Sequence, residues 1–294
     1  MSVFVQQSGT VCDFSGSDSW VILSPIEQSI KRKIEAVGTP LKDWDINIYR
    51  GVLTGCNEAF IISTEKRDEI LANCQSEDER KRTAELIRPI LRGRDIKRYG
   101  YEWANLWLIN THNGIKRKLE RIHIEDYPAV KAHLDQFWDK IKDRTDQGDT
   151  PYNLRNCAYL EDFSKPKIIY PNMTKYLPFV YDEAYFLTNQ KCFILTGQNM
   201  AYLTAFLNSS LFKYCFRDSF PELQGGTREL SKIFFDKIPV KKVSSEQNEM
   251  FREIINTVQS GYTEEQTVAI DNMLFDLYNL TVNERQSIGY IRIK

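Results

Sequence analysis

The stretch that decides the fold is KPKIIYPNMTKYLPFVYDEAYFLTNQKCFILTG, residues 165–197. It contains three runs rich in β-branched and aromatic residues, KIIYP, FVYDEAYFLTN and KCFILTG, which are typical of strands. Only short breaks of Pro, Asn or Lys separate these runs, and parallel strands need a longer crossover. The stretch therefore predicts an antiparallel meander, and the earlier segments INIYRGVL, EAFIIS and NLWLIN predict further strands.

Helix signals flank and interrupt these strands instead of alternating with them. Ser-x-x-Glu capping boxes predict helices that begin at Ser24 and at Ser76. Residues 126–148 and 199–216 carry apolar residues at helical spacing, and each range is expected to form a helix. This order favours an α+β fold with a mixed, mainly antiparallel twisted sheet and flanking helices.

The sequence changes character after Pro239. Two amphipathic segments, SSEQNEMFREIINTVQSG and TEEQTVAIDNMLFDLYNL, are joined at Gly261, and the second opens with a capping box at Thr263. We predict a C-terminal helical hairpin in residues 241–294 that can dock on another protein. We expect residues 1–240 to form the mixed α/β body.

Composition and charge set limits on the class of protein. With 294 residues and 42% hydrophobic content, the chain can bury a large core. It has no run of about 18 apolar residues, and its N-terminus lacks the pattern of a signal peptide. We expect a soluble, cytoplasmic protein without a membrane partner. The cysteines lie singly, which predicts reduced thiols and no metal site: Cys12, Cys56, Cys74, Cys157, Cys192 and Cys215.

Basic residues are concentrated although the net charge is only −1. The segment LIRPILRGRDIKRYG, residues 86–100, places five cations around Asp95, namely Arg88, Arg92, Arg94, Lys97 and Arg98. Two interpretations remain open. The cations can belong to a solvated turn that Arg94 and Asp95 lock, or they can bind phosphate.

Motifs for catalysis are not apparent in the sequence. It has neither the Gly-rich turn and Asn-Pro-Pro-type loop of amino-group methyltransferases nor a P-loop. Lys167, Asp182 and Glu183 do not have the spacing of a metal-dependent nuclease, and we interpret their proximity as coincidence. No histidine has a partner at triad or ligand spacing. We expect no catalytic residue and no metal in this chain, which favours a binding module.

Six segments follow one another in the chain, namely YRGVLTGCNEAFIIS, IRPILRGRDIKRYGY, DYPAVKAHLDQF, residues 165–197, YLTAFLNSSLFKYCFRD and FFDKIPV. In this order they resemble the TaqI-like C-terminal specificity domain of type IIG restriction-modification enzymes. The tail LNSS…GGTRELSKIFFDKIPVKKVSSEQ is also similar to the target recognition domain of type I specificity subunits.

The resemblance implies that residues 1–240 recognise a sequence in double-stranded DNA. It also implies a methyltransferase or nuclease domain or subunit as partner, adenine-specific in the related enzymes. S-adenosylmethionine and magnesium are expected only in that catalytic part, and no cofactor is expected in this chain.

Phosphate and base contacts are assigned to different segments. We expect the DNA backbone to contact Arg92, Arg94, Lys97, Arg98, Lys116, Arg117 and Lys118. Bases are expected to be read by the loops between the family's motifs, through Asn172, Lys175, Tyr176, Arg217, Gln224 and Arg228. The alternative for both loops is a simple connector.

Two other functions remain open at this point. The chain can be a methyltransferase or nuclease with its own unrecognised site, or an assembly module that binds a methyltransferase subunit through the terminal hairpin.

Overall fold

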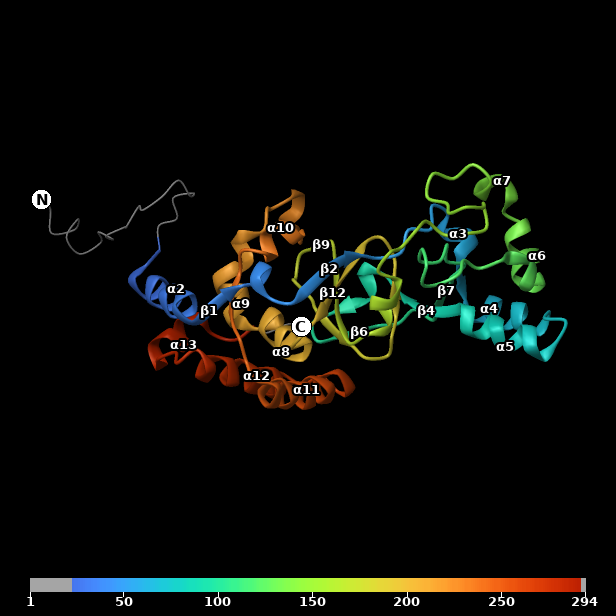
Figure 1. Ribbon diagram of the computed structural model, residues 1–294. Coiled ribbons are helices and arrows are strands. Elements are labelled where there is room, and N and C mark those ends of the chain that lie inside the picture. Colours follow the sequence, from blue (N-terminus) through green and yellow to red (C-terminus); the bar gives the residue numbers. More distant parts are fainter. Residues whose placement is uncertain (1–22, 292–294) are drawn as a thin grey trace, which may run out of the picture.

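The computed structural model describes residues 23–291 of the chain. Cys12, the N-terminus in which no signal peptide is expected, and the first 22 residues of the predicted body lie outside the described residues. The described molecule is elongated, with helices gathered at both ends and β-structure between them (Figure 1). Within residues 23–291, no helix combines the length and the apolar character that crossing a membrane requires.

A four-stranded antiparallel sheet lies at the middle of the molecule. Its strand order is β10-β8-β12-β2, with bounds Val180–Asp182, Lys167–Pro171, Cys192–Gly197 and Ile46–Arg50. The predicted meander is therefore wrong in its order, because β8 lies between β10 and β12. The run FVYDEAYFLTN also divides, and its second part, β11 (Leu187–Thr188), joins another sheet.

Strand β8 is buried along its whole length because it faces two cores. Ile168 and Tyr170 belong to the core that lies against the C-terminal helices. Ile169, between them, belongs to the core of the other lobe. Side chains alternate between the two faces of a strand, so the apolar run of residues 168–170 is what this position requires.

The second four-stranded sheet belongs to the lobe on the right of Figure 1. Its order is β11-β4-β7-β3, where β4 is Ile87–Leu91, β7 is Leu106–Ile109 and β3 is Ile61–Ser63. Only the β11–β4 pair is parallel. The helices of this lobe are α3 (Asn57–Phe60), α4 (Thr64–Ala72), α5 (Glu77–Leu86), α6 (Pro128–Asp135) and α7 (Trp138–Ile141). The mixed, mainly antiparallel α+β fold is confirmed.

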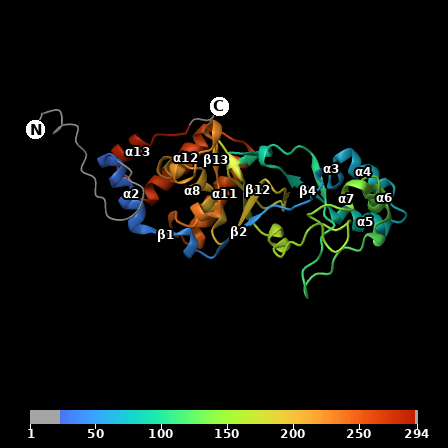
Figure 2. The ribbon, with the colours of Figure 1, turned by 90° about the horizontal axis from the view of Figure 1, so that it is seen from above.

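The opposite lobe is mainly helical. Strands β1 (Gly38–Pro40) and β14 (Pro239–Lys241) pair there, and helix α8 (Met200–Asn208) is buried along its whole length. The remaining helices are α2 (Pro25–Val37), α9 (Ser210–Phe216), α10 (Lys232–Phe235), α11 (Ser245–Ser260), α12 (Glu264–Leu277) and α13 (Val282–Ile288). Figure 2 shows the same lobes from above.

The predicted hairpin forms as α11 and α12, and Thr263 caps α12 as expected. Phe251 and Ile255 of α11 share one core with Leu203 of α8, so the hairpin packs against the body. The boundary at residue 240 stays a prediction.

Two predicted helices are interrupted. The range 199–216 divides at Ser209, whose hydroxyl accepts a hydrogen bond from the backbone N–H of Phe212 and so caps α9. The range 126–148 contains α6 and the short α7, separated by residues 136–137. Ser76 caps α5 as predicted, but the Glu79 carboxylate accepts from the backbone of Gln75 and Ala129 instead of closing the box. The apolar stripes of residues 126–148 and 199–216 did not reveal where these two predicted helices divide.

Candidate nucleic-acid interface

We call residues 92–97 the basic turn. Asp95 is buried at its centre and is held by Arg92. Its carboxylate accepts hydrogen bonds from the Arg92 backbone N–H at 2.8 Å, from Nε at 3.0 Å and from Nη2 at 2.8 Å. These bonds raise the pKa of Arg92. The turn, 3-10 helix η2 (Gly93–Asp95), is therefore locked by Arg92 and not by Arg94, which corrects the pair expected from the sequence.

The other cations of residues 86–100 have different environments. Arg94 and Lys97 are exposed, and the Lys97 ammonium lies 3.3 Å from the Glu102 carboxylate. Arg88 is half-buried and donates a hydrogen bond to the carbonyl of Tyr185 at 2.8 Å.

Arg98 is only 9% exposed. Its Nε donates to the carbonyl of Asn208 at 3.0 Å, at the end of α8, so its side chain is directed into the helical lobe.

The two loops expected to read bases are joined into one structure. Strand β9 (Met173–Thr174) pairs with β13 (Arg228–Glu229), with Thr174 opposite Arg228. Below this pair, the backbone N–H of Leu230 donates to the carbonyl of Asn172 at 2.8 Å. Segments that the sequence separates widely thus act as a single surface feature.

The basic turn lies against the same structure. A side chain on Gly93 would meet Cβ of Pro171 at 3.4 Å and the carbonyl oxygen of Lys191 at 3.5 Å. That carbonyl also accepts a hydrogen bond from the backbone N–H of Asn172 at 2.8 Å. We call residues 92–97, 172–176, 190–191 and 222–229 the loop edge.

The loop edge presents exposed polar and aromatic side chains. Tyr176 is 64% exposed, and Lys175 and Gln224 are also exposed. Gly225 and Gly226 both have φ near +76°, a conformation that favours glycine, so the tip of the second loop depends on them.

Arg228 is placed differently from the expectation of a base reader. It is only 6% exposed, and its Nη2 lies 2.8 Å from the carboxylates of both Asp218 and Glu222. Its Nη1 donates to the carbonyl of Phe220. The guanidinium therefore braces the loop that carries Gln224.

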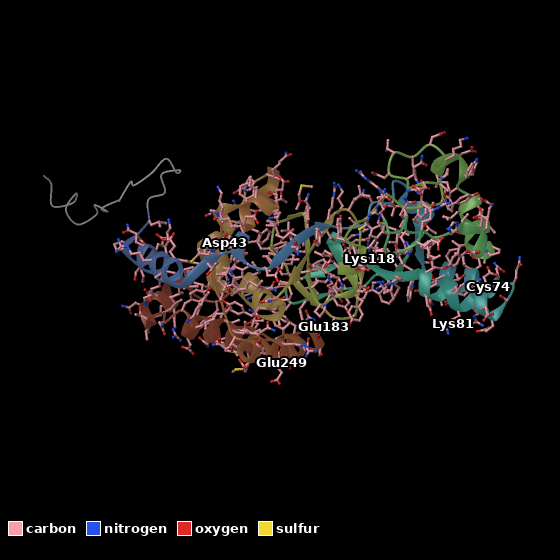
Figure 3. The ribbon with its side chains drawn as sticks, in the orientation of Figure 1. Asp43, Cys74, Lys81, Lys118, Glu183 and Glu249 are labelled. Carbon is pink, nitrogen blue, oxygen red and sulfur yellow. The ribbon has the colours of Figure 1, made fainter. Side chains whose placement is uncertain are left out.

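The predicted backbone contacts at Lys116, Arg117 and Lys118 lie outside the loop edge. They occupy an exposed turn closed by a bridge between Ile115 and Leu119, and Lys118 forms an ion pair with Glu161. Figure 2 shows this turn on the side of the molecule opposite to the β13 label, and Figure 3 labels Lys118. The structure does not bring these three cations together with Arg94 and Lys97.

Sequence reasoning missed one cation within the loop edge, Lys191, and one beside it, Arg50. Lys191 is exposed in the tight turn between β11 and β12. Its carbonyl accepts a hydrogen bond from the backbone N–H of Asn172 and lies next to Gly93. Arg50 is exposed at the end of β2 and donates to the carbonyl of Gln190 at 3.1 Å. The signal available in the sequence was the turn itself, TNQKC, which places a lysine between two strands.

Lys167 and Asp182 form a buried ion pair, with 2.5 Å between Nζ and Oδ2. They face each other across β8 and β10, and burial lowers the pKa of Lys167. The carboxylate also accepts from the backbone of Ala184 and Phe186. The two side chains thus have a structural role in the sheet, where they join β8 to β10. Over residues 23–291, no group of three or more His, Cys, Asp or Glu side chains is arranged to hold a metal ion.

The fold and the loop edge define a class of protein, a mixed α+β module whose loops are braced at one edge of its sheet. Residues 88–240, more than half of the chain, match the TaqI-like C-terminal specificity domain. The chain belongs to this family.

One curated relative is similar to the chain along most of its length. The chain is 20% identical over 280 residues to the type II methyltransferase M.PaeR7I of Pseudomonas aeruginosa, with 94% of this chain and 45% of that protein covered. The chain thus spans less than half the length of that relative.

Solved structures of restriction-modification enzymes are also similar to the chain. The type IIL enzyme MmeI, solved in complex with DNA, matches with a TM-score of 0.55 at 9% identity, over 83% of this chain and 34% of its own, and this likeness shows a shared fold. The type IIG restriction endonuclease BpuSI matches with a TM-score of 0.46 at 13% identity, over 87% and 33%.

Proposed function

We propose that this chain recognises a specific sequence in double-stranded DNA as the specificity domain of a restriction-modification enzyme. Membership of the TaqI-like specificity family supports this function, and so do the names of the related enzymes. The observation that carries the proposal is the β9–β13 pair, which joins two loops into one edge beside a basic turn. Exposed amide, ammonium and phenol groups there suit base edges and phosphates.

Methyl transfer or cleavage is assigned to another domain or subunit. The related methyltransferase is more than twice as long as the matched region, which leaves room for a catalytic part beside the specificity part. S-adenosylmethionine and magnesium would act in that part, and we place the assembled enzyme in the cytoplasm. A methyltransferase or nuclease site within this chain is not favoured.

Selection from a pool of random duplexes tests the proposal. The full chain is incubated with the pool at low salt, and bound duplexes are separated and sequenced. We expect enrichment of one short sequence. Failure to retard any duplex at low salt would contradict DNA recognition.

A second assay separates recognition from catalysis. The same chain is incubated with the enriched duplex, magnesium and labelled S-adenosylmethionine. We expect binding without methyl transfer or cleavage, and measurable turnover would instead establish an enzyme.

A further inference from the structure

Arg98 carries a positive charge into the helical lobe, and no carboxylate within residues 23–291 forms an ion pair with it. Besides the bond to Asn208, its Nη1 contacts the Tyr262 hydroxyl at 3.5 Å and the carbonyl of Ile291 at 3.4 Å. Its Nη2 is buried and has no hydrogen-bond partner among the described residues. Burying a cation with one donor unsatisfied is costly unless charge nearby compensates for it.

Two further cations approach the same place from α9. Lys213 and Arg217 are four residues apart, and this spacing puts them on one side of the helix and of the turn that continues it as η5 (Arg217–Ser219). Helical side chains lean toward the N-terminus, so Lys213 leans toward residues 208–210, where Arg98 is bound.

The charges repel one another. Burial lowers the pKa of Lys213, and the charges of Arg217 and Arg98 lower it further.

Carboxylates that lie nearby are already engaged. Asp271 accepts from the backbone N–H of Ser210 at 2.8 Å and from its hydroxyl at 2.5 Å. Asp218 binds Arg228. Across residues 23–291, neither Lys213 nor Arg217 takes part in an ion pair, and Arg217 Nε is buried without a partner. Burial raises the pKa of Asp271 and the charge of Arg98 opposes this rise, but no ion pair within residues 23–291 engages any of the three cations.

We infer that Arg98, Lys213 and Arg217 form a phosphate-binding site that holds one phosphate group of the DNA backbone. Lys213 and Arg217 are half-buried and supply the contacts, while Arg98 supplies charge from beneath them. This inference rests on the proposed function and assigns Arg217 to phosphate instead of bases. Ammonium and guanidinium groups are the usual donors to phosphate oxygens.

The position of the cluster fits a backbone contact beside the loop edge. Arg98 directly follows Lys97, the last residue of the basic turn. At the other side, Arg217 precedes Asp218, which holds the braced loop through Arg228. A strand whose bases face the loop edge would have phosphates on either side of it, and fixed phosphate contacts set the register in which bases are read.

The test compares the full-length wild type with the double variant Lys213→Gln and Arg217→Gln. Lys81→Gln serves as the matched control, because Lys81 is exposed on α5 at the far end of the molecule from α9 (Figures 1 and 3). Duplex affinity is measured over a series of salt concentrations for preferred and unrelated sequences. The slope of log affinity against log salt should become shallower by about 0.9 for each phosphate that the variant no longer neutralises.

A phosphate contact predicts the same fold loss of affinity for both sequences, and Arg217→Lys should retain most of the slope. Urea unfolding should show no loss of stability in the double variant, since removing charges relieves their repulsion. If the wild type binds DNA but the variant keeps its slope and affinity, or loses only the preference for one sequence, the inference is wrong. If the wild type binds no duplex, the proposed function is wrong and the inference falls with it.

Discussion

Thr174 and Arg228 face each other across a two-residue antiparallel pair, although the sequence places them in loops that lie on either side of β12 and α8. The pair makes one surface from two connectors. Because the Arg228 guanidinium is bound to Asp218, Glu222 and the carbonyl of Phe220, it braces the second loop. Preorganisation of this kind lowers the entropic cost of binding.

Arg228→Met should reduce discrimination between DNA sequences more than it reduces stability. The methionine keeps the apolar stem but leaves the loop without its brace. We expect the free energy of unfolding, measured in urea, to fall by about 1–2 kcal/mol. The preference for the selected duplex should weaken by about 1–3 kcal/mol if the loop no longer reads one base. Arg80→Met on α5 is the control, and an equal loss on all duplexes would show that Arg228 touches phosphate instead.

Tyr176→Ala should weaken binding to the selected duplex without changing stability. The ring is 64% exposed, so its removal exposes no core. Removing a base contact or a stacking contact would cost about 1–3 kcal/mol of binding free energy. Met250→Ala, which removes an exposed apolar side chain from α11, is the control for both measurements. Unchanged affinity in Tyr176→Ala would remove this residue from the interface.

Gly225→Ala should lower specific binding through backbone strain alone. Nothing lies within 4 Å of a Cβ added at Gly225, but its φ of +76° is unfavourable for alanine by about 1–2 kcal/mol. Gly261→Ala is the matched control, since that site is equally open and its φ of −168° suits any residue. Binding to the selected duplex should fall in the first variant and stay unchanged in the second. Equal binding by both would mean that the tip of the loop does not contact DNA.

Glu284 should make stability depend on pH in the acid range. Burial raises its pKa, but hydrogen bonds from Lys33, Thr281 and Ser29 outweigh this and lower the pKa to about 2. Because the folded pKa lies below the unfolded value of 4.5, the stabilisation is complete above pH 4.5 and is lost as pH falls toward 2. It amounts to up to about 3 kcal/mol.

The measurement is urea unfolding between pH 2.5 and 7 with the Glu284→Gln variant. The variant should be less stable than the wild type at pH 7, and the difference should shrink as the pH falls. A constant difference across this range would show that the carboxylate charge does not stabilise the contact between α2 and α13.

Local signals predicted much of the fold. Ser24, Ser76 and Thr263 cap helices as their sequence contexts indicate, because a cap depends only on neighbouring residues. Strand order was not predictable in the same way, since the place of β8 between β10 and β12 depends on two cores that lie on its opposite faces.

The site was predictable in composition but not in geometry. The sequence located the basic turn and both loops, yet Arg92 and not Arg94 binds Asp95, because a three-residue 3-10 turn brings the Arg92 side chain back over that carboxylate. The burial of Arg98 depends on Asn208, which is remote in the sequence. Such contacts arise from tertiary packing, which spacing along the chain does not record.

The most direct test of the central claim is the salt dependence of duplex binding by the full chain. If the loop edge and its neighbouring cations bind the DNA backbone, log affinity should fall linearly with log salt. The slope should be steeper than about −3, because several phosphate contacts are made. The selected duplex should remain preferred at every salt concentration. A slope near zero, or no preference between sequences at any salt concentration, would contradict the account.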